Sequence, residues 1–417
     1  EKTGTYGAMM SYGDNIARYI ARGVINDHIP DLSYTPQSPY SHTDIGNDAT
    51  SGDTHGGCWE DAFRDDIRKF RDYIARIDTV FNSEFGFHGP CRMRSVRKFM
   101  PEDKLWPLNE VWEHHIQDNP YNSLTETFVQ VQERCGAILF HKPESATEFV
   151  KVGGTVHAEI LREELEHHRR RMFTNAGALV WMMNDCWPCA SWSIVDYYGL
   201  PKQAYYSLKR SCAPVILSFR KVKTGYDLYV VNGNREGLSG NLRLELQTVT
   251  GESRVLARRK VNVRAQTSQV VAHLDAKDLP KPANSYLYAK LLHGPQDAMV
   301  EATWFPELWK RIAWPEPGIE MFPSRRTRKD GEFRCLVTLT TRNYARCVNL
   351  STEEDIPAYF SDNFFDMIPG ASKCIEIRSP QPFDPARLRL NHWLTTWDDR
   401  GGQDAIPGKP KRAFVTI

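Results

Sequence analysis

Three segments of the chain combine a short apolar run with polar side chains that could act on a substrate: residues 52–55, 79–87 and 176–185. In the second segment, Glu84 follows Val80 and Phe81 and precedes Phe85. A carboxylate held among apolar groups needs a cationic or hydrogen-bonding partner, because burial otherwise raises its pKa. Glu84 is therefore a candidate nucleophile or acid. The alternative interpretation is a carboxylate at a strand end that caps a loop.

The elements around these segments indicate how the polar groups are positioned. Up to about residue 213, apolar runs alternate with amphipathic stretches, which is an α/β pattern. One helix is expected over 158–173, with Glu159 and Glu163 at its start and arginines at its end, as the helix dipole favours. The β-α-β-α-β order fits part of a barrel or a doubly wound sheet. In a parallel barrel the polar strand ends meet at one face, where active sites lie.

After residue 213 the pattern changes to strands of period two. Six are expected before residue 306, over 226–232, 241–248, 255–263, 269–274, 285–292 and 299–305. Their spacing is typical of an immunoglobulin-like sandwich. Prolines at 315, 317 and 323 indicate a linker. Three further strands, over 333–341, 347–351 and 373–377, indicate a second sandwich, and residues 398–411 are expected to be frayed. We therefore predict domains at 1–213, 214–313 and 314–417.

Composition excludes several classes of protein. The 417 residues carry 53 basic and 52 acidic side chains, so the net charge of +1 offers no general attraction for nucleic acid or an anionic membrane. No apolar run is long enough to cross a bilayer. The adjacent histidines His114–His115 and His167–His168 point apart on a helix and lack an H-E-x-x-H pattern, so we expect solvated helix residues and no metal. The nine cysteines indicate neither disulfides nor a redox site.

Several motifs, in order, resemble one family. Residues 177–188, Gly-Ala-Leu-Val-Trp-Met-Met-Asn-Asp-Cys-Trp-Pro, look like the last barrel strand of β-mannosidases in the β-galactosidase superfamily of retaining glycosidases. Ser38-Pro39-Tyr40, Gly52-Asp53-Thr54-His55 and Ser83-Glu84-Phe85-Gly86-Phe87 resemble its fifth, sixth and seventh strand motifs. Residues 360–365 resemble its C-terminal immunoglobulin-like domain. The resemblance implies the C-terminal half of a TIM (β/α)8 barrel followed by two immunoglobulin-like sandwiches, within a longer protein.

The resemblance also implies roles for individual residues. Glu84 would be the nucleophile, and Glu1 would be the acid/base, at the place where the family's fourth strand ends in a Gly-Asn-Glu motif. The residues expected at the sugar are His55, Trp59, Trp181, Asn184 and Trp187. The implied activity is a retaining exo-β-mannosidase acting on β-linked mannoside oligosaccharides or glycoconjugates, with no metal or organic cofactor.

Two other interpretations remain open at this stage. Within the family, exo-β-glucosaminidase, β-galactosidase and β-glucuronidase activities are alternatives, because His88-Gly89 and Gly56-Gly57-Cys58-Trp59 depart from the usual motifs. Outside it, the chain could be a non-catalytic fragment or a carbohydrate-binding remnant, because strands one to four of the barrel are missing. The sequence selects neither a compartment nor an oligomeric state.

Overall fold

A computed structural model describes residues 15–35, 37–41, 47–57, 66–116, 126–279, 283–294, 296, 298–353 and 356–397. The chain begins there with a π-helix at Asn15–Ala21 and helix α2 at Arg22–His28. A small parallel sheet follows, made of β1 (Thr54–His55), β2 (Asn82–Phe85) and β3 (Ala178–Val180) in the order β1-β2-β3. The central strand therefore carries Glu84.

Helices lie between and after these strands. They are α4 (Phe70–Ile74), preceded by a 3₁₀ turn at Ile67–Lys69; α5 (Met93–Phe99); a 3₁₀ turn at Glu102–Lys104; α6 (Glu110–Ile116); α7 (Phe128–Leu139); α8 (Ala146–Arg170); and α9 (Gln203–Ser211). A capping box at Thr127 starts α7, and the Ser145 hydroxyl caps α8 by accepting from the Glu148 amide. Of the described helices, none is both long enough and apolar enough to cross a bilayer.

Helix α8 has 25 residues and starts well before the predicted residue 158. The pair Gly153–Gly154 lies inside it because neighbouring elements pack at close range. An added Cβ would lie 3.0 Å from Pro90 Cδ at Gly153 and 2.4 Å from Gln203 Nε2 at Gly154. The two glycines thus serve helix packing and do not end the helix.

The first sandwich joins two antiparallel sheets. One has the order β10-β9-β6-β7 and the other β4-β5-β8. The strands are β4 (Val215–Val222), β5 (Gly225–Asn232), β6 (Leu238–Thr248), β7 (Ser253–Val263), β8 (Thr267–Asp275), β9 (Ser285–His293) and β10 (Ala298–Trp304). Leu242, Leu244 and Leu246 of β6 point into the core between the sheets. All six predicted strands are present, and β4 is an addition.

The second sandwich follows a 3₁₀ turn at Trp309–Arg311. One sheet runs β11-β13-β17-β15, with β12 also on β13, and the other runs β16-β14-β18. The strands are β11 (Glu320–Pro323), β12 (Thr327–Lys329), β13 (Glu332–Thr340), β14 (Ala345–Ser351), β15 (Tyr359–Phe360), β16 (Phe365–Met367), β17 (Ser372–Ser379) and, after a 3₁₀ turn at Pro385–Arg387, β18 (Arg389–Asn391). The three predicted strands correspond to β13, β14 and β17.

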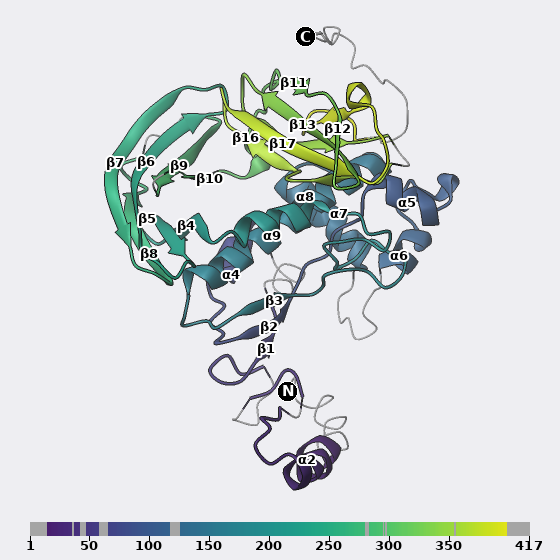
Figure 1. The fold of residues 1–417 in the computed structure, drawn as a ribbon, viewed down its shortest axis with the longest axis vertical. Helices are drawn as coiled ribbons and strands as arrows, with labels where there is room; N and C mark the ends of the chain where they lie inside the picture. The colour runs from purple at the N-terminus through teal and green to yellow at the C-terminus, as the bar shows by residue number, and fades with distance from the viewer. Residues whose placement is uncertain are drawn as a thin grey trace.

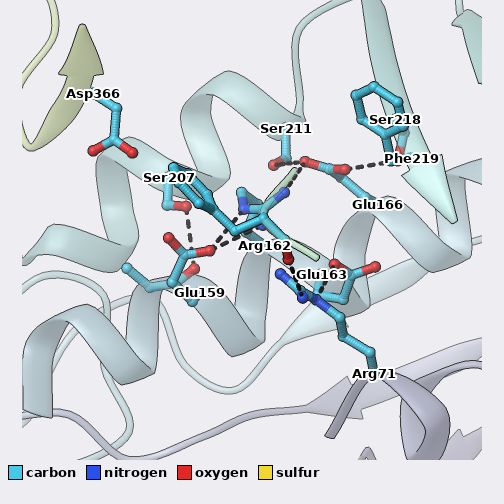
Figure 2. A network of polar contacts seen from close by, with 12 residues as sticks. Arg71, Glu159, Arg162, Glu163, Glu166, Ser207, Ser211, Ser218, Phe219 and Asp366 are labelled. Carbon is cyan, nitrogen blue, oxygen red and sulfur yellow. Dashed lines mark hydrogen bonds and ion pairs between the residues drawn. The ribbon is translucent and has the colours of Figure 1, made fainter. Parts of the chain in front are cut away.

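Helices α8 and α9 separate the parallel sheet from the two sandwiches (Figure 1). A row of charged side chains on α8 makes the connection (Figure 2). Glu166 accepts a 2.6 Å hydrogen bond from Ser218 of β4, in the first sandwich. Glu159 accepts a 2.9 Å hydrogen bond from Arg346 of β14, in the second. The helix that packs behind the parallel sheet therefore also holds both sandwiches.

Candidate active site

Glu84 lies near the C-terminal end of the central strand of the parallel sheet, and His55 lies opposite it on β1. The Nδ1 atom of His55 is 3.7 Å from Oε2 of Glu84. The two side chains are 29% and 34% exposed, so both are reachable from solvent while their backbones are held in the sheet. The amide of Gly56 fixes this end of β1 by donating to the Glu84 carbonyl across 2.8 Å.

Asp53, directly before β1, joins three segments around this pair. Its Oδ2 accepts hydrogen bonds from the hydroxyls of Ser38 and Ser83, and its Oδ1 accepts from the Tyr40 amide across 2.8 Å. The Ser38 hydroxyl also lies 2.8 Å from Nε2 of His55. Burial raises the pKa of Asp53, but the hydrogen bonds from the two serines and Tyr40 outweigh it, and the pKa is lowered overall. Asp53 is therefore an anion that holds His55 and the Glu84 strand.

Trp181, the first residue after β3, lies beside the Glu84 strand. Its amide donates to the carbonyl of Phe85 across 2.7 Å, and its side chain is 45% exposed. Gly86 permits this approach, because an added Cβ there would lie 2.5 Å from the Trp181 carbonyl oxygen and 2.9 Å from Cε3 of Trp192. An exposed indole next to the strand that carries Glu84 offers a flat face to a sugar ring.

Asn184 and Trp187 lie further along the same loop. The Trp187 ring stacks on His115 of α6, with centroids 5.2 Å apart, and contacts His114 edge-on. Asn184 is exposed, and its amide donates to the carbonyl of Asp185 across 3.2 Å. Within the part of the chain that the structure describes, neither side chain forms a hydrogen bond or ring contact with Glu84. The structure therefore brings Glu84, His55 and Trp181 together, while the ring contacts of Trp187 are with α6 and the hydrogen bond of Asn184 stays within its own loop.

A buried lysine joins the loops that follow β2 and β3. The Lys202 ammonium donates to the carbonyls of Gly89 and Ser191, each across 3.1 Å, and lies 3.5 Å from the Asp185 carboxylate. Lys202 and Asp185 are 1% and 3% exposed. Because Gly89 belongs to the first loop and Ser191 to the second, one side chain fixes both.

The prediction that His167 and His168 are solvated is wrong. They are 2% and 3% exposed, because α8 is covered by the parallel sheet on one side and by the sandwiches on the other. His168 Nε2 lies 3.2 Å from the amide nitrogen of Asn82, directly beneath β2. Burial, and then His167, Arg171 and Arg170, lower the pKa of His168 to about 3. Neutral His168 thus accepts from Asn82 and supports the strand of Glu84.

Two predicted site residues, Glu1 and Trp59, lie outside the described residues. Asp53, Ser38 and Lys202 were not predicted as site residues. Asp53 and Ser38 belong to two of the motifs that resemble the family. Their polar side chains at two expected strand ends could have indicated that they lie near the site. Lys202 stands in an ordinary loop and gave no signal. In the part of the chain that the structure describes, no group of three or more His, Cys, Asp or Glu side chains is arranged to hold a metal.

Two family models match the C-terminal part of the chain. A model for a mannosidase Ig/CBM-like domain matches residues 224–310, and a model for an Ig-fold domain matches residues 315–392. The immunoglobulin-like character predicted for both sandwiches is confirmed.

Known proteins resemble nearly the whole chain. β-Mannosidase B of Aspergillus niger is 24% identical over 391 residues, covering 87% of this chain and 44% of that protein. The Aspergillus oryzae protein of the same name is 25% identical over 393 residues, again covering 87% and 44%. The chain thus spans less than half the length of these relatives. The resemblance to β-mannosidases predicted from the motifs is confirmed.

Solved structures share the fold. The β-D-mannosidase of Dictyoglomus thermophilum superposes with a TM-score of 0.78 at 23% identity, over 91% of this chain and 45% of that one. The exo-chitosanase of Amycolatopsis orientalis superposes with a TM-score of 0.59 at 16% identity, over 76% and 42%. At these identities the superpositions establish the arrangement of elements.

Proposed function

We propose that this chain, a β-mannosidase-like member of a superfamily of glycosidases, carries the nucleophile of a retaining exo-β-mannosidase. The observation that supports this most is the position of Glu84. Its carboxylate is partly exposed near the C-terminal end of the central parallel strand, 3.7 Å from His55 and on the strand that hydrogen-bonds to Trp181. Active sites of parallel barrels lie at this end of the strands.

The parallel part is, in this proposal, the C-terminal half of a (β/α)8 barrel at residues 1–213, followed by sandwiches at 214–313 and 314–417. A closed barrel has eight strands, whereas the described residues form a parallel sheet of three with β1 and β3 at its edges. Leu179 of β3 is 54% exposed, as expected for a surface that other barrel elements cover. The chain covers 44% of the length of its relative from Aspergillus niger, which supports the proposal that it holds only part of a barrel.

The proposed reaction is a double displacement. The Glu84 carboxylate attacks the anomeric carbon of a terminal β-mannoside while a second carboxylic acid gives its proton to the departing glycosidic oxygen. The sugar is then held as an ester of Glu84. The second carboxylate next takes a proton from water, and the hydroxide attacks the anomeric carbon and releases mannose and free Glu84. We assign the second role to Glu1, because retaining chemistry needs two carboxyl groups, which such enzymes hold about 5–5.5 Å apart.

An exo-β-glucosaminidase is the second candidate, since the chain superposes on the exo-chitosanase with a TM-score of 0.59. The two activities use the same displacement and differ in the group at C2 of the sugar. Comparing β-mannoside and β-glucosaminide substrates under the same conditions separates them. A preference for the glucosaminide would overturn the assignment of mannose while leaving Glu84 as the nucleophile.

Covalent trapping tests the assignment of Glu84. A 2-deoxy-2-fluoro-β-mannoside with a good leaving group should form the ester and hydrolyse it slowly, because fluorine destabilises both oxocarbenium-like transition states. Mass spectrometry of the digested full-length protein should find the sugar on Glu84, and the Glu84→Gln variant should not be labelled. Labelling of another residue would contradict the proposal. If the full-length protein is labelled but residues 1–417 alone are not, the activity requires the longer chain.

A further inference from the structure

Asp53 is connected to His55 and to the strand of Glu84 through serine hydroxyls. The inference drawn from this arrangement rests on the proposed function. We propose that Asp53 is a positioning residue that, through Ser38 and Ser83, sets which nitrogen of His55 carries the ring hydrogen and holds the strand that carries Glu84. Asp53 itself does not contact Glu84 in the structure. Its effect passes through two hydroxyl groups.

The direction of the hydrogen bonds follows from counting hydrogens. A serine hydroxyl has one hydrogen, and the hydroxyls of Ser38 and Ser83 both donate to Oδ2 of Asp53. The carboxylate is an acceptor only, because the two serines and the Tyr40 amide keep the pKa of Asp53 low. Ser38 therefore has no hydrogen left for His55, although the two side chains are 2.8 Å apart.

His55 must then donate from Nε2 to the Ser38 oxygen. With Nε2–H fixed in this way, Nδ1 carries no hydrogen in the neutral ring, and it is the nitrogen 3.7 Å from Glu84. Two charged groups of the described residues interact with the His55 ring: Glu84, 3.7 Å from Nδ1, and Asp53, which is also linked to it through Ser38. A hydrogen on Nδ1 would be attracted to the negative carboxylate of free Glu84. The attraction would disappear in the glycosyl ester, because esterified Glu84 carries no charge.

The Ser83 bond acts on the strand. Ser83 directly precedes Glu84 in β2, and its hydroxyl joins the same carboxylate oxygen that holds Ser38. Asp53 lies just before β1, so this bond crosses between the two strands beside the His55–Glu84 pair. The same anion thus orients His55 and limits movement of the nucleophile's backbone, as groups behind a reacting residue commonly do.

The Asp53→Asn variant tests this in the full-length protein. The amide NH₂ of asparagine can donate to Ser38, which frees the Ser38 hydrogen for Nε2 of His55 and places the ring hydrogen on Nδ1 permanently. We expect kcat for an aryl β-mannoside to fall about 10- to 100-fold with a smaller change in KM, the size of effect found when a supporting group is removed. The pH profile of kcat/KM should also change shape. Asp66→Asn, at the N-cap of a 3₁₀ turn where asparagine can also accept from the Arg68 amide, is the matched control and should change neither.

Two further variants keep the proposal testable if Asp53→Asn folds poorly. Ser38→Ala removes the bond to His55 and should reproduce the altered pH profile, whereas Ser83→Ala should lower kcat without altering the profile. The rate of fluoro-sugar labelling separates the two proposals. If wild type is labelled on Glu84 and all three variants are labelled equally fast with unchanged pH profiles, the role of Asp53 is overturned and Glu84 stands. If wild type is never labelled on Glu84, the proposed function itself fails.

Discussion

Arg346 of β14 donates a 2.9 Å hydrogen bond to Glu159 of α8, although the two residues belong to different layers of the molecule. Arg346 is 3% exposed and also donates to Asp366 across 3.1 Å. Burial alone would raise the pKa of Glu159, but Arg162 and Arg346 lower it to about 2. The second sandwich is thus joined to the long helix by a charged contact whose arginine is buried.

Replacing Arg346 by Met should destabilise the protein strongly. The change leaves Asp366 without its arginine and Glu159 with Arg162 alone, and breaking a buried ion pair costs about 3–5 kcal/mol. Urea unfolding measures the loss. Arg387→Met, which removes a pair with Glu353 on a side chain that is 69% exposed, is the control and should leave the free energy of unfolding almost unchanged. Equal effects of both substitutions would contradict the assignment of stability to the buried contact.

Stability should fall as the pH is lowered below about 6.5. The pKa of His168 is lowered from 6.5 to about 3, and the carboxylate of Glu164, 4.0 Å away, does not offset the burial. The neutral ring is therefore retained in the folded state, while the unfolded chain takes up a proton below its ordinary pKa. The contribution of His168 is fully present above pH 6.5 and is lost as the pH falls toward 3.

Urea unfolding at pH 7.5 and pH 5.0 measures this effect. The His168→Gln variant, which can still accept from Asn82, should lose about 2 kcal/mol less than wild type between the two pH values. His293→Gln, a histidine of β9, is the control and should keep the wild-type difference. An unchanged pH dependence in His168→Gln would show that the buried ring does not carry the effect.

The Gly86→Ala variant should disturb the packing between β2 and the loop that carries Trp181. Its Cβ would lie 2.5 Å from the Trp181 carbonyl oxygen, so β2 and the loop after β3 must separate. Overpacking of this kind costs about 1–3 kcal/mol, and activity should fall with it because Trp181 moves away from Glu84. Gly23→Ala in α2 is the control, since nothing lies within 4 Å of its added Cβ. Activity equal to wild type in Gly86→Ala would mean that the close approach is dispensable.

Removing the nucleophile should abolish turnover and change the product that a small anion can form. We expect Glu84→Ala to lower kcat at least about 10⁴-fold, as removal of a nucleophile does in other enzymes. Azide can enter the space left by the carboxylate and attack an activated β-mannoside, giving the α-mannosyl azide. NMR of the product measures its configuration. A β-azide, or full activity without azide, would contradict the assignment, and Glu102→Ala on an exposed turn is the control.

Two kinds of element could be predicted from the sequence. They are strands in which buried and exposed residues alternate, and parallel strands that are separated by helices. Strand β5 alternates in exposure over part of its length and was predicted within one residue, whereas β4 was missed because residues 215–219 are all buried and leave no alternation. The start of α8 was missed because glycines normally oppose a helix, and only the close packing of Pro90 and Gln203 explains them.

The candidate site was predictable to the same degree. The closeness of His55 and Glu84 follows from parallel strands ending at one edge, and the structure shows them as register partners. The hydrogen bonds of Asp53 depend on the path of the loop that brings Ser38 to it, and no spacing encodes that path. His167 and His168 were misjudged because the residues they contact, Ile77 and Asn82, lie far from α8 in the sequence.

The single lysine that holds two loop backbones has a consequence for engineering. Exchanging the loop after β2 or the loop after β3 for that of a relative would move the carbonyl of Gly89 or of Ser191 to which Lys202 donates. Grafting either loop alone would leave the Lys202 ammonium or the Asp185 carboxylate without part of its hydrogen-bonding or charged partners in the buried interior. The two loops should therefore be exchangeable only as a unit that also contains Lys202.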